Sequence, residues 1–90
     1  MVYELYLHID KSGAKTIKDL DRTTINRIHK RLKELAKDPL DPRISSPVEM
    51  GQEERKSRVG NWRIFYEIDE YTHTVNITAV RPRGRAYRNY

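Results

Sequence analysis

The chain has 90 residues, of which 37% are hydrophobic and 34% charged, and its formal net charge is +5 at pH 7. This length allows one domain with a modest core, and the absence of cysteine excludes disulfides and a cysteine-based zinc site. No apolar run approaches the roughly 20 residues of a membrane span, and we see no signal-peptide core, so we expect a cytoplasmic protein. The positive charge favours a nucleic acid or an acidic protein as partner.

The first predicted element is a half-buried strand over residues 2–9, where apolar and polar side chains alternate. Apolar residues at three-residue spacing over 14–20 then predict a short helix. Asp21 is the predicted N-cap of a second, longer helix. That helix ends at Asp38–Pro39, because the residue before a proline avoids the α region. The short connection predicts that the two helices form an antiparallel hairpin.

Residues 39–52 contain three prolines and one glycine, and we predict a loop. It is either a plain surface excursion or a flexible wall beside a site in the segment that follows. The sequence leaves both interpretations open.

Residues 55–68 predict a β-hairpin around the two-residue turn Gly60–Asn61. Side chains alternate across a strand, so the core face carries the apolar set of the second strand: Trp62, Ile64, Tyr66 and Ile68. A second turn over 69–74 leads to a last strand over 75–80. The predicted register pairs Ile68 with Val75, Tyr66 with Ile77, Ile64 with Ala79 and Arg63 with Val80.

The opposite face of this hairpin concentrates positive charge. Arg58 is predicted to face Arg63 directly, with Lys56 and Phe65 beside them, and like charges in that position destabilise a sheet. Either a multiply charged anion or the splaying of solvated side chains relieves this repulsion. The chain that leaves the last strand brings further basic and aromatic residues to the same place: Arg81, Arg83, Arg85, Tyr87, Arg88 and Tyr90.

This composition suits RNA. Guanidinium groups pair with phosphate as planar forks, and Phe65, Tyr87 or Tyr90 would stack on unpaired bases. An ordinary basic tail explains the C-terminal run if that run is taken alone. His8, His29 and His73 share no spacing, and the four glycines form no phosphate loop, so we expect no metal site, no histidine catalyst and no cofactor.

The element order is therefore β-α-α-β-β-β. It predicts one α+β domain over residues 1–90, in which a mainly antiparallel four-stranded sheet packs against the helical hairpin. In this domain the side chain of Arg63 is expected to face solvent, while Trp62 is expected to lie in the core.

The hairpin run K-S-R-V-G-N-W-R-I-F-Y-E-I-D, the strand V-N-I-T-A-V and the turn R-P-R-G-R-A-Y-R resemble the RelE/ParE superfamily of type II toxin–antitoxin systems. The resemblance covers nearly the whole chain and is greatest to RelE-like mRNA interferases. It implies a RelE-like fold with a short C-terminal helix or tail. It also implies a ribosome-dependent endoribonuclease that cleaves mRNA in the A site, where the 2′-hydroxyl attacks the adjacent phosphate.

Carried over position by position, the catalytic residues of the family match Lys56, Arg58, Arg63, Arg83 and Tyr87. Arg63 and Arg83 would stabilise charge on the phosphate, Lys56 would act as the base, and Tyr87 would stack on the RNA base or protonate the leaving oxygen. Arg58 stands where some active members have lysine, and Pro82 where many relatives have His or Lys. The identity of the base and the choice between Arg81 and Arg83 therefore stay open. Further RNA contacts are expected from Phe65, Arg81, Arg85 and Arg88.

The resemblance also implies partners: an acidic, RelB-like antitoxin, the ribosome with its mRNA, and operator DNA through the toxin–antitoxin complex alone. The antitoxin would cover the basic face or displace the C-terminal helix. Two alternatives remain. A ParE-like toxin would poison DNA gyrase, although such proteins generally do not keep the full basic set, and a decayed relative would bind RNA or antitoxin without cleaving.

Overall fold

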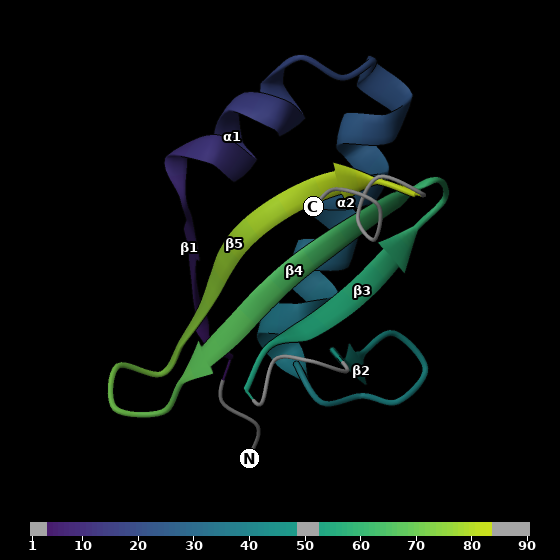
Figure 1. Ribbon diagram of the computed structural model, residues 1–90. Helices are drawn as coiled ribbons and strands as arrows, with labels where there is room; N and C mark the ends of the chain where they lie inside the picture. The colour runs from purple at the N-terminus through teal and green to yellow at the C-terminus, as the bar shows by residue number, and fades with distance from the viewer. Residues whose placement is uncertain (1–3, 49–52, 84–90) are drawn as a thin grey trace.

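The computed structural model describes residues 4–48 and 53–83. Within them the chain forms two helices and five strands, as Figure 1 shows. In chain order these are β1 (Tyr6–Ile9), α1 (Lys11–Lys18), α2 (Arg22–Lys37), β2 (Ser46–Pro47), β3 (Arg55–Val59), β4 (Trp62–Asp69) and β5 (Thr74–Pro82). Neither helix has the length and hydropathy that crossing a membrane requires.

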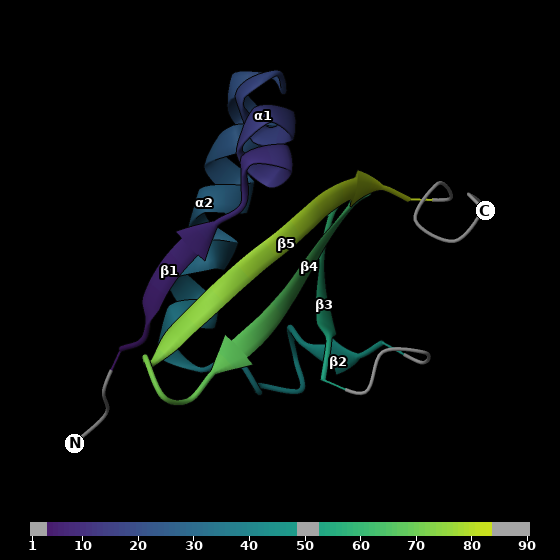
Figure 2. The same cartoon turned by 60° about the vertical axis from the view of Figure 1, so that its left-hand side comes forward.

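The strands form one mixed sheet in the order β1-β5-β4-β3-β2. β1 runs parallel to β5, and the other neighbours are antiparallel. Both helices cover the same face of the sheet, and no helix of residues 4–48 and 53–83 covers the other, which we call the open face (Figure 2). The predicted α+β class is confirmed. The sheet has one strand more than expected, because two residues of the proline-rich segment, Ser46 and Pro47, pair with the outer edge of β3.

The helices begin and end largely where the sequence predicted. The Asp21 side chain accepts a hydrogen bond from the Thr24 backbone N–H at 3.1 Å, which confirms the N-cap of α2. α1 starts at Lys11, with Asp10 in the N-cap position but without a hydrogen bond from the helix to its side chain. It tolerates Gly13 because the helix lies very close to the sheet there. A Cβ on Gly13 would stand 3.4 Å from the Ile9 side chain and 3.8 Å from those of Ile77 and Val80.

The core lies between the helices and the covered face of the sheet. Its fully buried side chains come from α2, β4 and β5, and they include Ile28, Leu35, Ile64, Tyr66, Val75 and Ile77. Trp62 and Ile68 are partly buried and pack against this cluster. The core face of the hairpin is therefore the one that the sequence predicted.

A β-bulge between β4 and β5 changes the predicted register halfway along the strands. Ile68 pairs with Val75 and Tyr66 with Ile77, as predicted, but the register shifts between Phe65 and Tyr66. Beyond the shift, Ile64 faces Val80 and Arg63 faces Arg81. The predicted pairs Ile64–Ala79 and Arg63–Val80 are wrong, because β5 carries one residue more than β4 at the bulge. The extra residue brings Arg81 beside Arg63.

The described part of the long loop is tied to the sheet by buried hydrogen bonds. The Tyr66 hydroxyl, on β4, donates to the Pro39 carbonyl at 2.6 Å and also bonds the Ser45 hydroxyl. Arg55 Nε donates to the same Ser45 oxygen at 2.7 Å. Residues 39–48 therefore pack onto the end of the sheet that carries β2.

Candidate functional site

Three arginines lie side by side across the open face of the sheet, one on each of three adjacent strands. Arg58 of β3 pairs with Arg63 of β4, and Arg63 pairs with Arg81 of β5. Directly opposite residues in an antiparallel pair have Cβ atoms about 4.5–5.5 Å apart and point to the same face. We call these three residues the arginine row. Like charges in this arrangement destabilise the sheet until an anion neutralises them.

The central member of the row is buried. Arg63 is 6% exposed, whereas Arg58 and Arg81 are exposed on either side of it. The prediction that Arg63 faces solvent is wrong. Its strand lies between two others, and its neighbours across both strands are long side chains on the same face.

The Arg63 guanidinium also has an unsatisfied donor. Its Nη1 is buried, and no group in residues 4–48 and 53–83 accepts a hydrogen bond from it. Burying a cation without a partner costs free energy on the order of several kcal/mol, and an unsatisfied buried donor is rare in native proteins. A phosphate oxygen would accept from Nη1 and would cancel charge on all three arginines.

Lys56 and Phe65 form the next pair along the same face. Lys56 is half-buried, two residues from Arg58, so its ammonium belongs to the surroundings of the row. Phe65 is only 7% exposed. The Phe65 ring presents little free surface in this structure, and stacking of a base on it stays a prediction.

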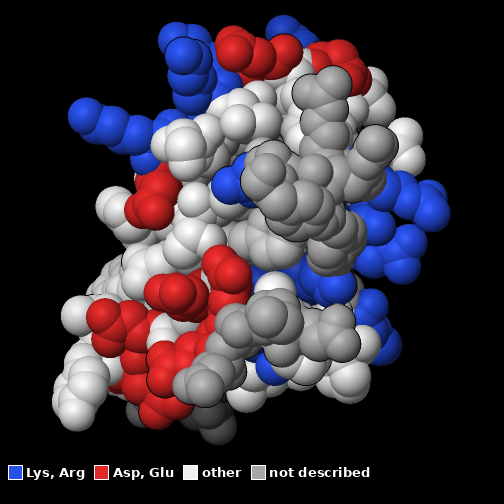
Figure 3. All heavy atoms as spheres, viewed as in Figure 1, with Lys and Arg blue, Asp and Glu red and all other residues white. Residues whose placement is uncertain are grey.

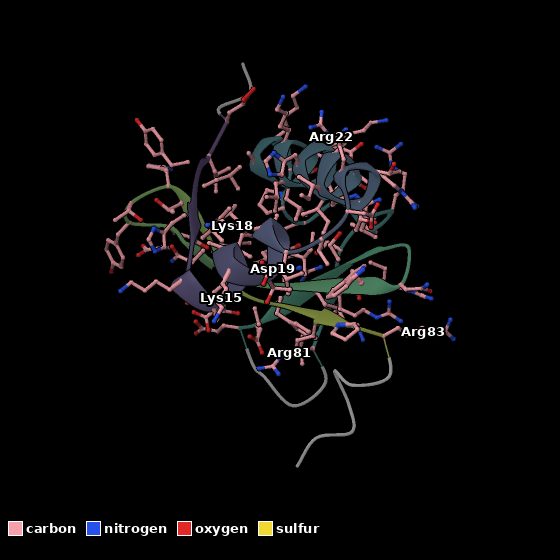
Figure 4. All side chains as sticks on the ribbon, turned by 90° about the horizontal axis from the view of Figure 1, so that it is seen from above. Lys15, Lys18, Asp19, Arg22, Arg81 and Arg83 are labelled. Carbon is pink, nitrogen blue, oxygen red and sulfur yellow. The ribbon has the colours of Figure 1, made fainter. Side chains whose placement is uncertain are left out.

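The exit of β5 separates Arg81 from Arg83. Pro82 pairs with Trp62, and the Arg83 backbone N–H donates to the Asn61 carbonyl at 2.6 Å, so the exit is held at the hairpin turn. The two arginine side chains extend in different directions from this end of the sheet (Figure 4). The row includes Arg81, and Arg83 stands beyond it. The remaining predicted site residues lie outside the described residues: Arg85, Tyr87, Arg88 and Tyr90.

The open face has opposite charge at its two ends. Acidic side chains of one end line a shared hollow near the β4–β5 turn, namely Glu53, Glu54, Glu67, Asp69 and Glu70. Figure 3 shows acidic atoms gathered over this turn, at the lower left, with smaller acidic groups at the top. Lys and Arg atoms lie along the right-hand side, which carries the β3–β4 hairpin turn, and at the upper left. Such a separation of charge draws a polyanion to the basic end and away from the acidic one.

The helices strengthen this asymmetry. Residues 11–37 hold nine Lys or Arg and three Asp or Glu, so the helical layer alone has a larger net charge than the whole chain. Lys15, Lys18 and Arg22 surround the helical side of the end that also presents Arg81 and Arg83 (Figure 4). The basic surface therefore extends around this end of the molecule.

Sequence reasoning missed one residue of the site's surroundings. Arg31 of α2 stands in a run of basic residues that a helix normally exposes, yet it is half-buried. Its Nη1 donates to the Ser57 hydroxyl at 2.8 Å and to the Arg58 carbonyl at 2.6 Å. Helical periodicity gave no signal for this contact, because Arg31 lies at the border between the apolar and basic faces of α2.

The three histidines do not converge. His8 lies 3.5 Å from Asp10 at the exposed end of β1, and within the described ranges no three His, Cys, Asp or Glu side chains gather as metal ligands do. The chemistry that the site offers is therefore that of arginine and lysine: binding an oxyanion and stabilising negative charge that grows on it.

Comparison with known proteins agrees with this fold. The family model described as "ParE toxin of type II toxin-antitoxin system, parDE" matches residues 7–87. Among curated protein sequences, none matches the chain.

Several solved structures are similar. RelE from Pyrococcus horikoshii OT3, solved in complex with RelB, superposes with a TM-score of 0.77 at 21% identity, covering 94% of this chain and 99% of that one. The isolated E. coli RelE toxin gives a TM-score of 0.78 at 18% identity, with 92% and 88% covered. YoeB from Staphylococcus aureus, solved as a dimer, gives 0.73 at 14% identity, with 87% and 95% covered. At these identities the likeness concerns the fold.

Proposed function

Because the chain belongs to the ParE toxin family of type II toxin–antitoxin systems, within the RelE/ParE superfamily, we propose that it is a toxin that cleaves mRNA in the ribosomal A site. The observation that carries this proposal is the arginine row, in which the buried Nη1 of the central arginine has no acceptor among the described residues. A gyrase poison has no evident need for a buried, unsatisfied phosphate receptor, whereas a phosphodiester cleaving enzyme does.

The proposed reaction divides the work among the basic residues. The 2′-oxygen of the RNA forms a bond to phosphorus, and the bond from phosphorus to the 5′-oxygen breaks, leaving a cyclic phosphate and a 5′-hydroxyl. Arg63 and Arg81 donate to the non-bridging oxygens, where negative charge increases in the transition state. Lys56 accepts the proton of the 2′-hydroxyl, and Tyr87 supplies one to the 5′-oxygen or stacks on the base.

The arrangement of β5 favours Arg81 over Arg83 as the second phosphate ligand. Arg81 lies directly across from Arg63, while Arg83 stands at the hairpin turn with its side chain directed elsewhere. Arg83, Arg85 and Arg88 would then bind neighbouring phosphates of the RNA or the ribosome.

The same proposal includes partners and location. The toxin acts in the cytoplasm on ribosomes and mRNA, and an acidic RelB-like antitoxin neutralises it. Structures of RelE from Pyrococcus horikoshii and Methanococcus jannaschii were solved as complexes with RelB, which supports an antitoxin as partner. Operator DNA would be bound by the complex, not by the toxin alone.

A ParE-like function is the second candidate, because the matching family model is that of ParE toxins. In that case the basic surface would contact DNA gyrase, and cells expressing the protein would accumulate gyrase-dependent DNA damage while their mRNA stays intact. A non-catalytic relative would bind RNA or antitoxin with no cleavage and no damage.

The deciding experiment is mRNA cleavage on programmed ribosomes, mapped by primer extension. Wild-type protein is compared with Arg63→Met, each with and without ribosomes. We expect cuts in the A-site codon with wild-type protein and ribosomes together, and in no other reaction. Cleavage by neither protein, with both folded, would contradict the nuclease proposal, and supercoiling assays with gyrase would then test the second candidate.

A further inference from the structure

Within residues 4–48 and 53–83, the outer edge of β3 has a strand partner along only part of its length. β2 pairs with Arg55 and Lys56 and ends there. Val59 and Trp62 flank the two-residue turn of the hairpin. Because hydrogen-bonded and non-hydrogen-bonded pairs alternate in an antiparallel ladder, the Arg58 carbonyl points away from β4, toward this outer edge. The Arg58 carbonyl, where the arginine row begins, therefore needs a hydrogen-bond donor from outside the β3–β4 ladder.

Arg31 supplies that donor from the helical layer. One guanidinium nitrogen, Nη1, donates to the Arg58 carbonyl at 2.6 Å and to the buried Ser57 hydroxyl at 2.8 Å. The Nε donates to Glu34 Oε1 at 2.9 Å, which fixes the orientation of the guanidinium plane. The side chain is 23% exposed, so water competes little for these bonds. Hydrogen bonds from a charged donor are roughly twice as strong as neutral ones.

We propose that Arg31 is a positioning residue for the arginine row: it takes the place of the missing strand at the edge of β3 and fixes the backbone from which Arg58 extends toward Arg63. This inference rests on the proposed function for its catalytic consequence, but its structural part stands on the contacts alone. Neither the family match nor the sequence pattern assigns Arg31 this role.

The charge of Arg31 favours a role in the function of the arginine row over a role that is limited to holding β3 in place. Its guanidinium adds positive charge at a strand that already presents Lys56 and Arg58, and among the described residues its ion pair is with Glu34. A neutral donor would hold the strand without that repulsion. A cation at the Arg58 carbonyl instead raises the positive potential around the row, which favours an anion there.

The test uses Arg31→Gln and the conservative Arg31→Lys, with Arg27→Gln as the matched control. Arg27 is exposed on the same helix, close to the hairpin turn: its Nη1 would lie 3.4 Å from a Cβ on Gly60. Its substitution removes the same charge near the same hairpin without touching the β3 backbone in the described structure. Cleavage is measured as single-turnover rates on programmed ribosomes over a range of toxin concentrations, at a temperature where all variants are folded.

A positioning role predicts that Arg31→Gln lowers the maximal cleavage rate by up to about 10²-fold, as misplacement of a reacting group by about 1 Å does. The half-saturating concentration should change less than the rate. Arg31→Lys should restore part of the rate, because an ammonium can reach one of the two acceptors. Arg27→Gln should change the half-saturating toxin concentration and leave the maximal cleavage rate at the wild-type value. A wild-type maximal rate in folded Arg31→Gln would overturn the proposal.

A second measurement does not depend on cleavage. Amide hydrogen exchange of Ser57 and Val59, which pair with β4, should be at least about tenfold faster in Arg31→Gln, while β4–β5 amides keep their protection. Unchanged protection at both amides would refute the proposed fixing of β3. If the wild type does not cleave but the exchange prediction holds, the nuclease proposal fails and the structural role of Arg31 survives.

Discussion

Two buried polar side chains on β4, Tyr66 and Arg63, differ in whether the described residues satisfy their hydrogen bonds. Tyr66 is fully buried on the core face, and its hydroxyl is satisfied by the Pro39 carbonyl and the Ser45 hydroxyl. Arg63 lies three residues earlier on the opposite face, is 6% exposed, and its Nη1 has no partner among the described residues. The same strand thus carries one complete polar network and one incomplete one.

This difference in hydrogen bonding indicates a structural role for Tyr66 and supports a ligand-binding role for Arg63. A buried polar group with all its partners stabilises the fold, and its loss leaves those partners unpaired. A buried cation without a partner lowers stability, and it is retained where a ligand completes its hydrogen bonds. Tyr66 therefore holds the long loop on the sheet, while Arg63 is the residue that we propose as the receptor for phosphate.

The largest expected effect concerns Arg63→Met, which keeps the length of the side chain and removes its charge. Cleavage should fall by about 10²–10³-fold, the usual loss when one preorganised donor to a transition-state oxyanion is removed. The free energy of unfolding should stay the same or rise, because an unpaired buried charge disappears. Single-turnover cleavage and urea unfolding measure the two quantities. A large loss of stability would show that Arg63 belongs to the fold.

The next effect compares Arg81→Gln with Arg83→Gln, two substitutions of equal charge on the same segment. The bulge places Arg81 across from Arg63, so Arg81→Gln should reduce the maximal cleavage rate more, by roughly tenfold or above. Arg83→Gln should mainly raise the toxin concentration that gives half-maximal cleavage, and it should raise it more at high salt. The opposite ranking of the two maximal rates would exclude Arg81 from the reacting phosphate.

Removing the Tyr66 hydroxyl should lower the stability of the fold and leave the cleavage rate unchanged, the opposite of what we expect for Arg63→Met. Tyr66→Phe leaves the buried Pro39 carbonyl and Ser45 hydroxyl short of a partner, at a cost of about 1–3 kcal/mol in unfolding free energy. Cleavage by the folded protein should remain near the wild-type rate. Urea unfolding measures the stability, and cleavage is measured at a urea concentration well below the unfolding midpoint. A loss of cleavage rate without a loss of stability would contradict the structural role of Tyr66.

The smallest expected effect is a dependence of stability on pH at the start of α2. Hydrogen bonds from the Thr24 side chain and backbone lower the pKa of Asp21 below its ordinary value of 3.8. Folding is therefore favoured by this carboxylate at pH values above 3.8, and the contribution is lost as the pH falls toward the folded pKa. Asp21→Asn should be slightly less stable at neutral pH, and thermal unfolding should show the difference shrinking in strong acid.

Local chemistry made parts of the fold predictable. Gly60–Asn61 defined the hairpin and its register, because a glycine adopts the left-handed φ of 58° found at Gly60 without strain. Asp21 defined the start of α2 through its side-chain cap. The pairing of Arg58 with Arg63 then followed from counting residues out from the turn.

The remainder depends on tertiary contacts that leave no local pattern. The bulge that brings Arg81 beside Arg63 has no glycine to mark it, and its extra residue, Thr78, donates hydrogen bonds to the Phe65 carbonyl and to Glu54. The burial of Arg63 depends on neighbours in two other strands. Arg31 meets β3 across 26 and 27 residues of sequence, which helical periodicity does not reveal.

The most direct test of the receptor role is a titration of the arginine side-chain ¹⁵N resonances with a short RNA whose 2′-hydroxyls are methylated, so that it binds but is not cleaved. The account predicts that the Arg63 resonances shift most and exchange more slowly with water on binding, and that Arg63→Met weakens binding at least about tenfold. Arg63 resonances that stay unchanged while exposed arginines respond would contradict it, since phosphate would then bind elsewhere.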